Sequence, residues 1–304
     1  MTRFRDETLK VVAEQICLTT KQDFHIQAIQ SISGGDISSA FKFEGKTKSY
    51  FVKLNRPQML NMFQAEFAGL QALAQTNTVS VPRPVLCGNT DKISFLVLEY
   101  IELNRFTTLS KRLLGQQLAE LHLMPQPYFG WHIDNTIGST IQLNSQTKDW
   151  IRFWHKLRLD FQLQLAISKG YGKQLAALGG LLIERLADFF QGYTPSPSLL
   201  HGDLWSGNVA STIGDNPIIF DPACYFGDRE TDLAMTELFG GFGRDFYAAY
   251  NDVWELDSGY QTRKHLYNLY HVLNHLNLFG GNYVFQAETM MKNLVQEVGS
   301  FKLF

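Results

Sequence analysis

The stretch HGDLWSGN, residues 201–208, places a carboxylate, Asp203, five residues before a carboxamide, Asn208. It follows the apolar run SLL at 198–200. A carboxylate and an amide at this separation are compatible with an ordinary polar turn. They are equally compatible with the proton acceptor and a metal ligand of a phosphoryl-transfer site. The rest of the chain decides between these two interpretations.

A second acidic motif favours the phosphoryl-transfer interpretation. Asp203 and Asn208 match the D-x-x-x-x-N spacing of a kinase catalytic loop. Short apolar runs flank the turn at 214–217, which predicts a compact hairpin that ends at Asp221. Such a hairpin brings its ends together, so we expect Asn208 and Asp221 to face one Mg²⁺, a cation that takes oxygen ligands. Asp203 is then the base, and His201 is interpreted as structural support for the loop.

The N-terminal third contains further parts that ATP chemistry requires. Lys53 lies in YFVKLN between strand-forming residues, and Glu66 follows on a predicted helix. In this order, a strand lysine binds phosphate oxygens and a helix carboxylate orients it. Gly34 and Gly35 lie between two predicted strands, in a turn that would let backbone amides approach phosphates. The alternatives are a plain hairpin for the glycine pair and a solvated position for the lysine and the glutamate.

The composition favours a globular protein with a small-molecule partner. The chain has 304 residues, of which 45% are hydrophobic and 18% charged, and its net charge is −2. It therefore lacks the positive field that would hold a nucleic acid or an anionic membrane. Its three cysteines are far apart, which excludes a zinc cluster and a disulfide framework. The N-terminus is not typical of a signal peptide, and no apolar run approaches roughly 18 residues, so we expect a cytoplasmic protein.

The order of predicted elements indicates an α+β fold in two parts. The first part is expected to contain a helix over 1–20, strands over 26–54, a helix over 61–76 and a strand over 92–102. The second is mostly helical, with helices over 108–124, 149–168 and 178–192 and again from about 230 onward. We therefore predict an ATP-binding lobe at 1–98, a hinge at 99–104 and a helical lobe at 105–304 that carries the catalytic loop and acceptor site. A ligand cleft is expected between the two lobes.

Three stretches resemble the fructosamine kinase, or ketosamine-3-kinase, family: HGDLWSGN, FDPACYFGDRETDLAMTELFGGF and LYHVLNHLNLFGGNY. The resemblance begins at the loop SISGGDISSAFKF and covers nearly the whole chain. It implies a bilobal protein-kinase-like fold, with a small antiparallel sheet lobe, a larger helical lobe, and ATP and Mg²⁺ between them. The implied reaction is phosphorylation of the sugar 3-hydroxyl of a ketosamine, a ribulosamine or fructosamine adduct of an amine. The 3-phosphate then decomposes and releases the amine, which amounts to deglycation.

The resemblance also implies roles for individual residues. Lys53 would bind the α- and β-phosphates, with Glu66 orienting it. The hinge that meets adenine would consist of Glu99, Tyr100 and Ile101. Trp205 would be a platform for the sugar-amine, although a packing role is an equal alternative. Asp228 and Arg229 would lie near the acceptor side.

The cysteines carry a separate expectation. Some family members have a cysteine in the glycine loop that is tied to redox control, whereas this loop has Ser33 and Ser38 and no cysteine. Redox regulation is therefore not expected here. Cys224, three residues after Asp221, is interpreted as a small buried hydrophobe rather than a reactive thiol.

Two other functions remain open at this point. Aminoglycoside and choline phosphotransferases share the HGD and Asn pattern, and a fold does not determine its substrate. Aminoglycosides are polycations, however, and this mildly acidic chain has an aromatic, His- and Asn-rich last third. A pseudokinase scaffold that only binds ATP is the other alternative. It is disfavoured because the lysine, the base and both metal ligands are all present.

Overall fold

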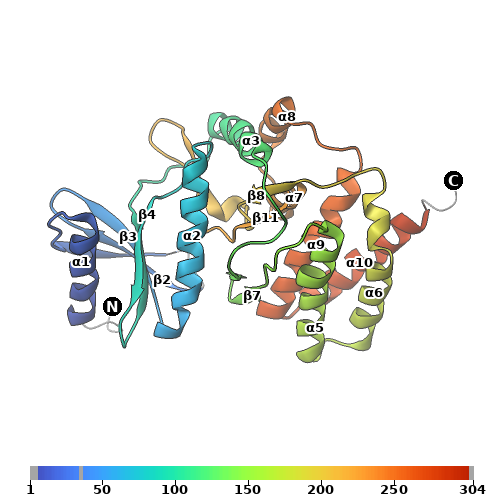
Figure 1. Cartoon of the computed structure of the whole chain (residues 1–304), viewed down its shortest axis with the longest axis horizontal. Helices are drawn as coiled ribbons and strands as arrows, with labels where there is room; N and C mark the ends of the chain where they lie inside the picture. Colours follow the sequence, from blue (N-terminus) through green and yellow to red (C-terminus); the bar gives the residue numbers. More distant parts are fainter. Residues whose placement is uncertain (1–5, 34–36, 301–304) are drawn as a thin grey trace.

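A small antiparallel sheet precedes a larger, mainly helical part (Figure 1). The computed structural model describes residues 6–33 and 37–300. The sheet has five strands in the order β1-β2-β3-β5-β4, and every neighbouring pair is antiparallel. These strands are β1 (Ala28–Ile32), β2 (Ser39–Glu44), β3 (Ser49–Asn55), β4 (Pro84–Asn89) and β5 (Ser94–Glu99). The predicted α+β class, with an antiparallel sheet followed by helices, is confirmed.

The two faces of the sheet are covered by different helices, α1 (Asp6–Thr20) and α2 (Leu60–Thr76), which Figure 1 shows on opposite sides of it. Side chains alternate between the faces along each strand. Val52 and Leu54 on β3 are buried in the core that contains α1. Lys53 therefore projects to the opposite face, where α2 lies between the sheet and the helical part.

The helical part is built around α9, which is buried along most of its length. Its main helices are α3 (Thr108–Leu123), α6 (Lys173–Glu184), α7 (Glu230–Leu238), α8 (Arg244–Val253), α9 (Tyr260–Phe279) and α10 (Tyr283–Ser300). α7, α10 and a further helix, α5 (Asp160–Ser168), each pack against α9, and α3 packs against α8. These helices share one hydrophobic core with α2, so the two parts of the chain are joined through a continuous apolar contact.

Two predicted helices differ from the observed ones. The segment 149–168 consists of α4 (Trp150–Trp154), a π-helical turn η2 (His155–Leu159) and α5 (Asp160–Ser168). The segment 178–192 contains the end of α6 and a 3₁₀ turn, η3 (Leu186–Phe190). Hydrophobic periodicity does not distinguish an extra residue in one turn from a regular helix, which explains the first difference.

Several short strands frame the segments singled out in the sequence. The expected hairpin is present as β9 (Val209–Ser211) and β10 (Pro217–Ile219). The strands β8 (Pro197–Leu200) and β11 (Tyr225–Asp228) pair with each other, as do β6 (Asn135–Ile137) and β7 (Thr140–Gln142). None of these four was predicted, because each is only three or four residues long and its partner is not signalled locally. The β8–β11 pair brings the loop after 200 beside the segment before 225.

In the described part of the chain, 6–33 and 37–300, no helix combines the length and the apolar character needed to span a bilayer. A cytoplasmic location and the lobe boundaries at 98 and 104 stay predictions.

Candidate active site

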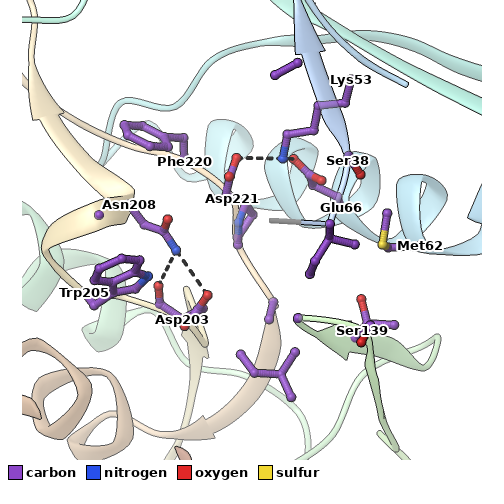
Figure 2. Close-up of a pocket in the computed structure, with 18 of the residues that line it drawn as sticks. Ser38, Lys53, Met62, Glu66, Ser139, Asp203, Trp205, Asn208, Phe220 and Asp221 are labelled. Carbon is purple, nitrogen blue, oxygen red and sulfur yellow. Dashed lines mark hydrogen bonds and ion pairs between the residues drawn. The ribbon is translucent and has the colours of Figure 1, made fainter. Parts of the chain in front are cut away.

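A cavity of about 770 Å³ lies between the sheet and the helical part. Figure 2 shows that its polar side chains come from both: Lys53 and Glu66 from the sheet and α2, and Asp203, Asn208 and Asp221 from the loops below. All five residues that the sequence picked out for phosphoryl transfer therefore line one cavity.

Lys53 joins the two sides of the cavity through a pair of ion pairs. Its Nζ lies 2.7 Å from Glu66 Oε1 and 2.8 Å from Asp221 Oδ1. Burial alone would lower the pKa of Lys53, but the charges of Asp221 and Glu66 outweigh it and raise the pKa above its usual value. The lysine is thus a permanent cation whose position is determined by a carboxylate from α2 and one from the loop at 221.

Asp203 faces the cavity beside Asn208. The Nδ2 group of Asn208 donates to the backbone oxygen of Asp203 at 2.8 Å and to its Oδ2 at 3.2 Å (Figure 2). Burial, and then the nearby charge of Asp221, raise the pKa of Asp203 to about 7, while the hydrogen bond from Asn208 opposes this. A carboxylate with a pKa near neutrality is suited to accept a proton from a substrate hydroxyl.

His201 holds the loop and does not enter the cavity lining. It is fully buried, and burial lowers its pKa. Its Nδ1 accepts from the backbone N–H of Asp203 at 3.3 Å, so its Nε2 carries the proton and donates to the backbone oxygen of Phe220 at 2.9 Å. This neutral imidazole connects the Asp203 loop to the residue before Asp221, as expected for a structural histidine.

Asp232 holds the same loop from α7. Its carboxylate accepts from the backbone N–H groups of His201 at 2.7 Å and Gly202 at 2.8 Å. Its Oδ2 also lies 3.3 Å from His122 Nε2. Burial would raise the pKa of Asp232, but these hydrogen bonds and the neighbouring His122 hold it below its usual value. Asp232 was not predicted from the sequence, because its backbone partners lie 30 and 31 positions away along the chain.

The predicted hinge residues Glu99, Tyr100 and Ile101 line the cavity; Glu99 ends the inner strand β5, and the other two follow it. The Glu99 N–H donates to the Arg83 backbone oxygen at 2.9 Å, which secures the end of the strand. Gly34 and Gly35 lie outside the described residues. The flanking residues Ser33 and Ser38 line the cavity next to Lys53.

A further part of the cavity lining is mostly aromatic, and we call it the acceptor wall. It consists of Trp205, Phe239, His271, Asn274, His275, Leu278 and Phe279. The rings contact one another: Trp205 meets Phe239 edge-on at 5.9 Å between centroids, and Phe239 lies 5.2 Å from His275. Burial, followed by the neighbouring His275, lowers the pKa of His271 to about 3, so this imidazole is neutral. Five of these residues come from α9, whose aromatic and amide-rich sequence is equally typical of a core helix.

Trp205 is the member of the acceptor wall that lies beside Asp203, as Figure 2 shows. Its ring packs so closely on Gly207 that a side chain at that position would collide with it. Trp205 therefore both packs against its own loop and lines the cavity.

The expectation that Asp228 and Arg229 lie at the acceptor side is corrected by the structure. Both are buried and neither lines the cavity. Asp228 accepts hydrogen bonds from the hydroxyls of Tyr193 and Tyr267, at 2.9 and 2.5 Å. Arg229 lies 3.7 Å from the Trp254 ring centroid and donates to backbone oxygens at 254 and 255. Their partners come from α9 and from the segments that follow η3 and α8, and they cover both charges.

Cys224 is buried, as expected, and packs against Gly69 of α2. Burial raises the pKa of its thiol well above the usual value, which disfavours the reactive thiolate.

Comparison of the sequence with known proteins identifies the family of this chain. The family model of fructosamine kinase matches residues 8–297. The chain belongs to the fructosamine kinase family. It is 46% identical over 288 residues to a probable ketoamine kinase of Synechocystis sp., covering 94% of this chain and 97% of that protein. It is 39% identical over 285 residues to the chloroplastic protein-ribulosamine 3-kinase of Oryza sativa subsp. japonica, covering 93% and 83%. The resemblance noted in the sequence, and the assignment to an ATP-dependent phosphotransferase class, are confirmed.

Solved structures agree on the fold. A crystal structure of a proposed fructosamine-3-kinase of Haemophilus somnus superimposes with a TM-score of 0.87 at 29% identity, covering 94% of this chain and 97% of that one. An ADP-bound aminoglycoside phosphotransferase has a TM-score of 0.66 at 16% identity, covering 96% and 99%. The second similarity shows a shared fold alone. The predicted bilobal, protein-kinase-like fold is confirmed.

Proposed function

We propose that this protein is a ketosamine kinase: it transfers the γ-phosphoryl group of ATP to the sugar 3-hydroxyl of a ribulosamine or fructosamine adduct of an amine. One observation carries the proposal. Asp203, Asn208 and Asp221 line the same cavity as the Lys53–Glu66 pair, and an aromatic wall lines that cavity as well. The chain thus brings a base, phosphate-binding groups and an acceptor surface together.

In this reaction the acceptor hydroxyl oxygen forms a bond to the γ-phosphorus, and the bond from that phosphorus to the β-γ bridging oxygen breaks, so ADP leaves. Asp203 takes the hydroxyl proton. Lys53, oriented by Glu66, supplies positive charge to the phosphates. Glu99, Tyr100 and Ile101 are proposed to contact adenine, and the loop at 33–38, including Gly34 and Gly35, to cover the phosphates.

Asn208 and Asp221 fit a Mg²⁺ site. Asn208 donates to Asp203 through its Nδ2, and Asp221 accepts from Lys53 through its Oδ1. Among the described residues, no group donates to the other oxygen of either side chain, Asn208 Oδ1 or Asp221 Oδ2, so both are available to a cation. Within that same part of the chain, no group of three or more His, Cys, Asp or Glu side chains has metal-site geometry. Mg²⁺ needs no such group, because it is usually held by one or two protein oxygens, phosphates and waters. When bound, it would neutralise charge on the phosphates.

The acceptor wall favours a sugar-amine with one positive charge over a polycation. Among the described residues, the carboxylates that line the cavity are Glu66, Glu99, Asp203 and Asp221, and none belongs to the acceptor wall. Trp205 presents an aromatic surface next to Asp203, and such surfaces stack on sugar rings and attract a single ammonium group. The relatives named as a ketoamine kinase and a protein-ribulosamine 3-kinase support the same substrate class.

The test is ADP release by the purified protein with ATP and Mg²⁺, using ribuloselysine, fructoselysine, kanamycin and choline as acceptors. We expect turnover on a ketosamine, with the product phosphorylated at the 3-hydroxyl, and loss of that turnover in Asp203→Asn. Turnover on kanamycin or choline but not on either ketosamine would keep the phosphotransferase and refute the substrate. ATP binding with no turnover on any acceptor would favour the scaffold alternative.

A further inference from the structure

Arg158 is a fully buried cation that takes part in none of the ion pairs among the described residues. Its guanidinium lies 4.3 Å from the ring centroid of Tyr225 and 4.6 Å from that of Phe153. It donates to the Leu143 backbone oxygen at 2.6 Å and to Asn144 Oδ1 at 2.8 Å. Burying a charge without a carboxylate is costly, so these contacts need an explanation beyond the packing of a core.

The π-helical turn η2 determines where Arg158 points. The buried pair Phe153 and Trp154 is followed five positions later by the buried pair Arg158 and Leu159. A regular helix would repeat its buried face after three or four residues. The extra residue in η2 therefore places the guanidinium on the inner face of the helix. π-helical turns are frequent at functional sites.

From Arg158 a chain of amide side chains leads to the segment after Asp221. Asn144 Nδ2 donates to Asn135 Oδ1 at 3.0 Å, and Asn135 Nδ2 donates to the Cys224 backbone oxygen at 2.8 Å. Gln142 Nε2 donates to Asn135 Oδ1 at 2.8 Å and to the Ala223 backbone oxygen at 3.2 Å. The acceptor ends are also occupied, since Tyr270 donates to Gln142 Oε1 at 2.8 Å. Asn135 and Gln142 are thus each held in one orientation, with donors directed at the backbone oxygens of 224 and 223.

These two backbone oxygens belong to the segment that carries Asp221. Asp221 has a φ of 57°, in the left-handed region that is uncommon for residues other than glycine. On its other side, the same segment is tied to the catalytic loop, because the Ala223 N–H donates to the His201 backbone oxygen at 2.8 Å. A backbone in this conformation persists only where its surroundings hold it.

We propose that Arg158 is a positioning residue that, through Asn144, Asn135 and Gln142 and through the Tyr225 ring, holds Asp221 where it can bind Mg²⁺. Arg158, Asn144 and Gln142 do not line the cavity, so they act on the site through the 221–225 segment. This inference rests on the Mg²⁺ role proposed above for Asp221, and it assigns the buried network to metal binding rather than to acceptor recognition.

The test measures ADP binding by calorimetry over a series of Mg²⁺ concentrations and again in EDTA, without any acceptor. Gln142→Met keeps the side-chain volume but removes both donors. We expect the Mg²⁺ concentration for half-maximal enhancement of ADP binding to rise roughly 10-fold or more, as when other residues behind a metal ligand are removed. ADP binding in EDTA should be unchanged, which a general loss of structure would not produce.

Gln117→Met is the matched control, because Gln117 lies on α3 outside the cavity lining, and its buried Oε1 has no hydrogen-bond partner among the described residues. It should leave the Mg²⁺ dependence unchanged. Arg158→Lys, which keeps the charge but loses the contact with Asn144, is measured in parallel and carries the test if Gln142→Met fails to fold. Wild-type Mg²⁺ dependence in a folded Gln142→Met or Arg158→Lys protein would overturn the proposal. A wild-type protein that binds ADP with Mg²⁺ but phosphorylates no ketosamine would refute the proposed substrate and leave this inference intact.

Discussion

The α-carbon of Gly202 faces the backbone oxygen of Ala223 with no room for a side chain between them. This contact joins the catalytic loop to the segment after Asp221, since Gly202 immediately precedes Asp203. Gly202 also has a φ of 81°, which side chains rarely permit. The base and the proposed metal ligand are therefore held at a separation that depends on glycine at this one position.

Gly202→Ala should impair both stability and turnover. The added methyl group overlaps the Ala223 oxygen and strains the backbone, so we expect a loss of about 2–4 kcal/mol in the free energy of unfolding. The methyl group also forces the two loops apart. Turnover should therefore fall even at temperatures where the variant is fully folded. Denaturant unfolding and steady-state kinetics measure the two effects. Gly180→Ala is the control: it lies on α6, and among the described residues no atom lies within 4 Å of the added carbon, so it should leave turnover unchanged and should not lower stability. Equal behaviour of the two variants would contradict the role of Gly202.

Asp203→Asn should remove turnover while leaving nucleotide binding intact. The amide keeps the size of the carboxylate but does not accept the hydroxyl proton, and loss of a general base typically costs about 10²- to 10⁴-fold. The Lys53–Glu66 pair and Asp221 are unaltered, so ADP affinity measured by calorimetry should stay close to that of the wild type. Asp252→Asn, an exposed position on α8, controls for the loss of one negative charge. Near-normal turnover in Asp203→Asn would show that another group accepts the proton.

The pH dependence should report the pKa of the same carboxyl group. Only the ionised form of Asp203 accepts a proton, and its pKa is raised to about 7 by burial and by the charge of Asp221. kcat/KM for ATP, which reports the free enzyme, should therefore increase with pH through about 7 and level off above it. Bound Mg²⁺ would offset the charge of Asp221 and lower that pKa, so the rise in kcat should lie at lower pH than the rise in kcat/KM. A kcat/KM that is flat between about pH 6 and 8 would contradict this assignment.

The five residues that the sequence predicted for phosphoryl transfer share one cavity, because their positions depend on short local elements. Asp203 and Asn208 lie on one loop, the β9–β10 hairpin leads to Asp221, and Lys53 and Glu66 belong to adjacent elements. Spacing along the chain is enough to relate such residues. Their chemical roles stay predictions until the variants are measured.

Positions that depend on distant packing were not predictable in the same way. Asp228 and Arg229 stand in a charged run near Asp221, yet Tyr267 of α9 and Trp254, which follows α8, cover them. The acceptor wall and the Arg158 network arise only when α9, η2 and the β6–β7 hairpin meet. Their sequence signals are aromatic residues, amides and one arginine within apolar helices, and these are equally typical of a core.

Lys53→Met should weaken productive nucleotide binding far more than the loss of an ordinary surface lysine. Lys53 is the cation that joins Glu66 to Asp221, and its removal leaves the buried Glu66 carboxylate without a partner. Burial already raises the pKa of Glu66 against the opposing effect of Lys53, so in the variant this pKa should rise further. We expect kcat/KM for ATP to fall by about 100-fold or more, corresponding to about 3 kcal/mol of lost transition-state stabilisation.

The matched control is Lys42→Met, on the neighbouring strand β2, because Lys42 also pairs with a glutamate, Glu44, but lies outside the cavity lining. Double variants with Glu66→Gln then separate two causes. If the lysine acts on phosphates, Lys53→Met should impair kcat/KM in both backgrounds; if its removal is harmful only through the unpaired carboxylate, Glu66→Gln should restore activity and the phosphate role of Lys53 would be wrong.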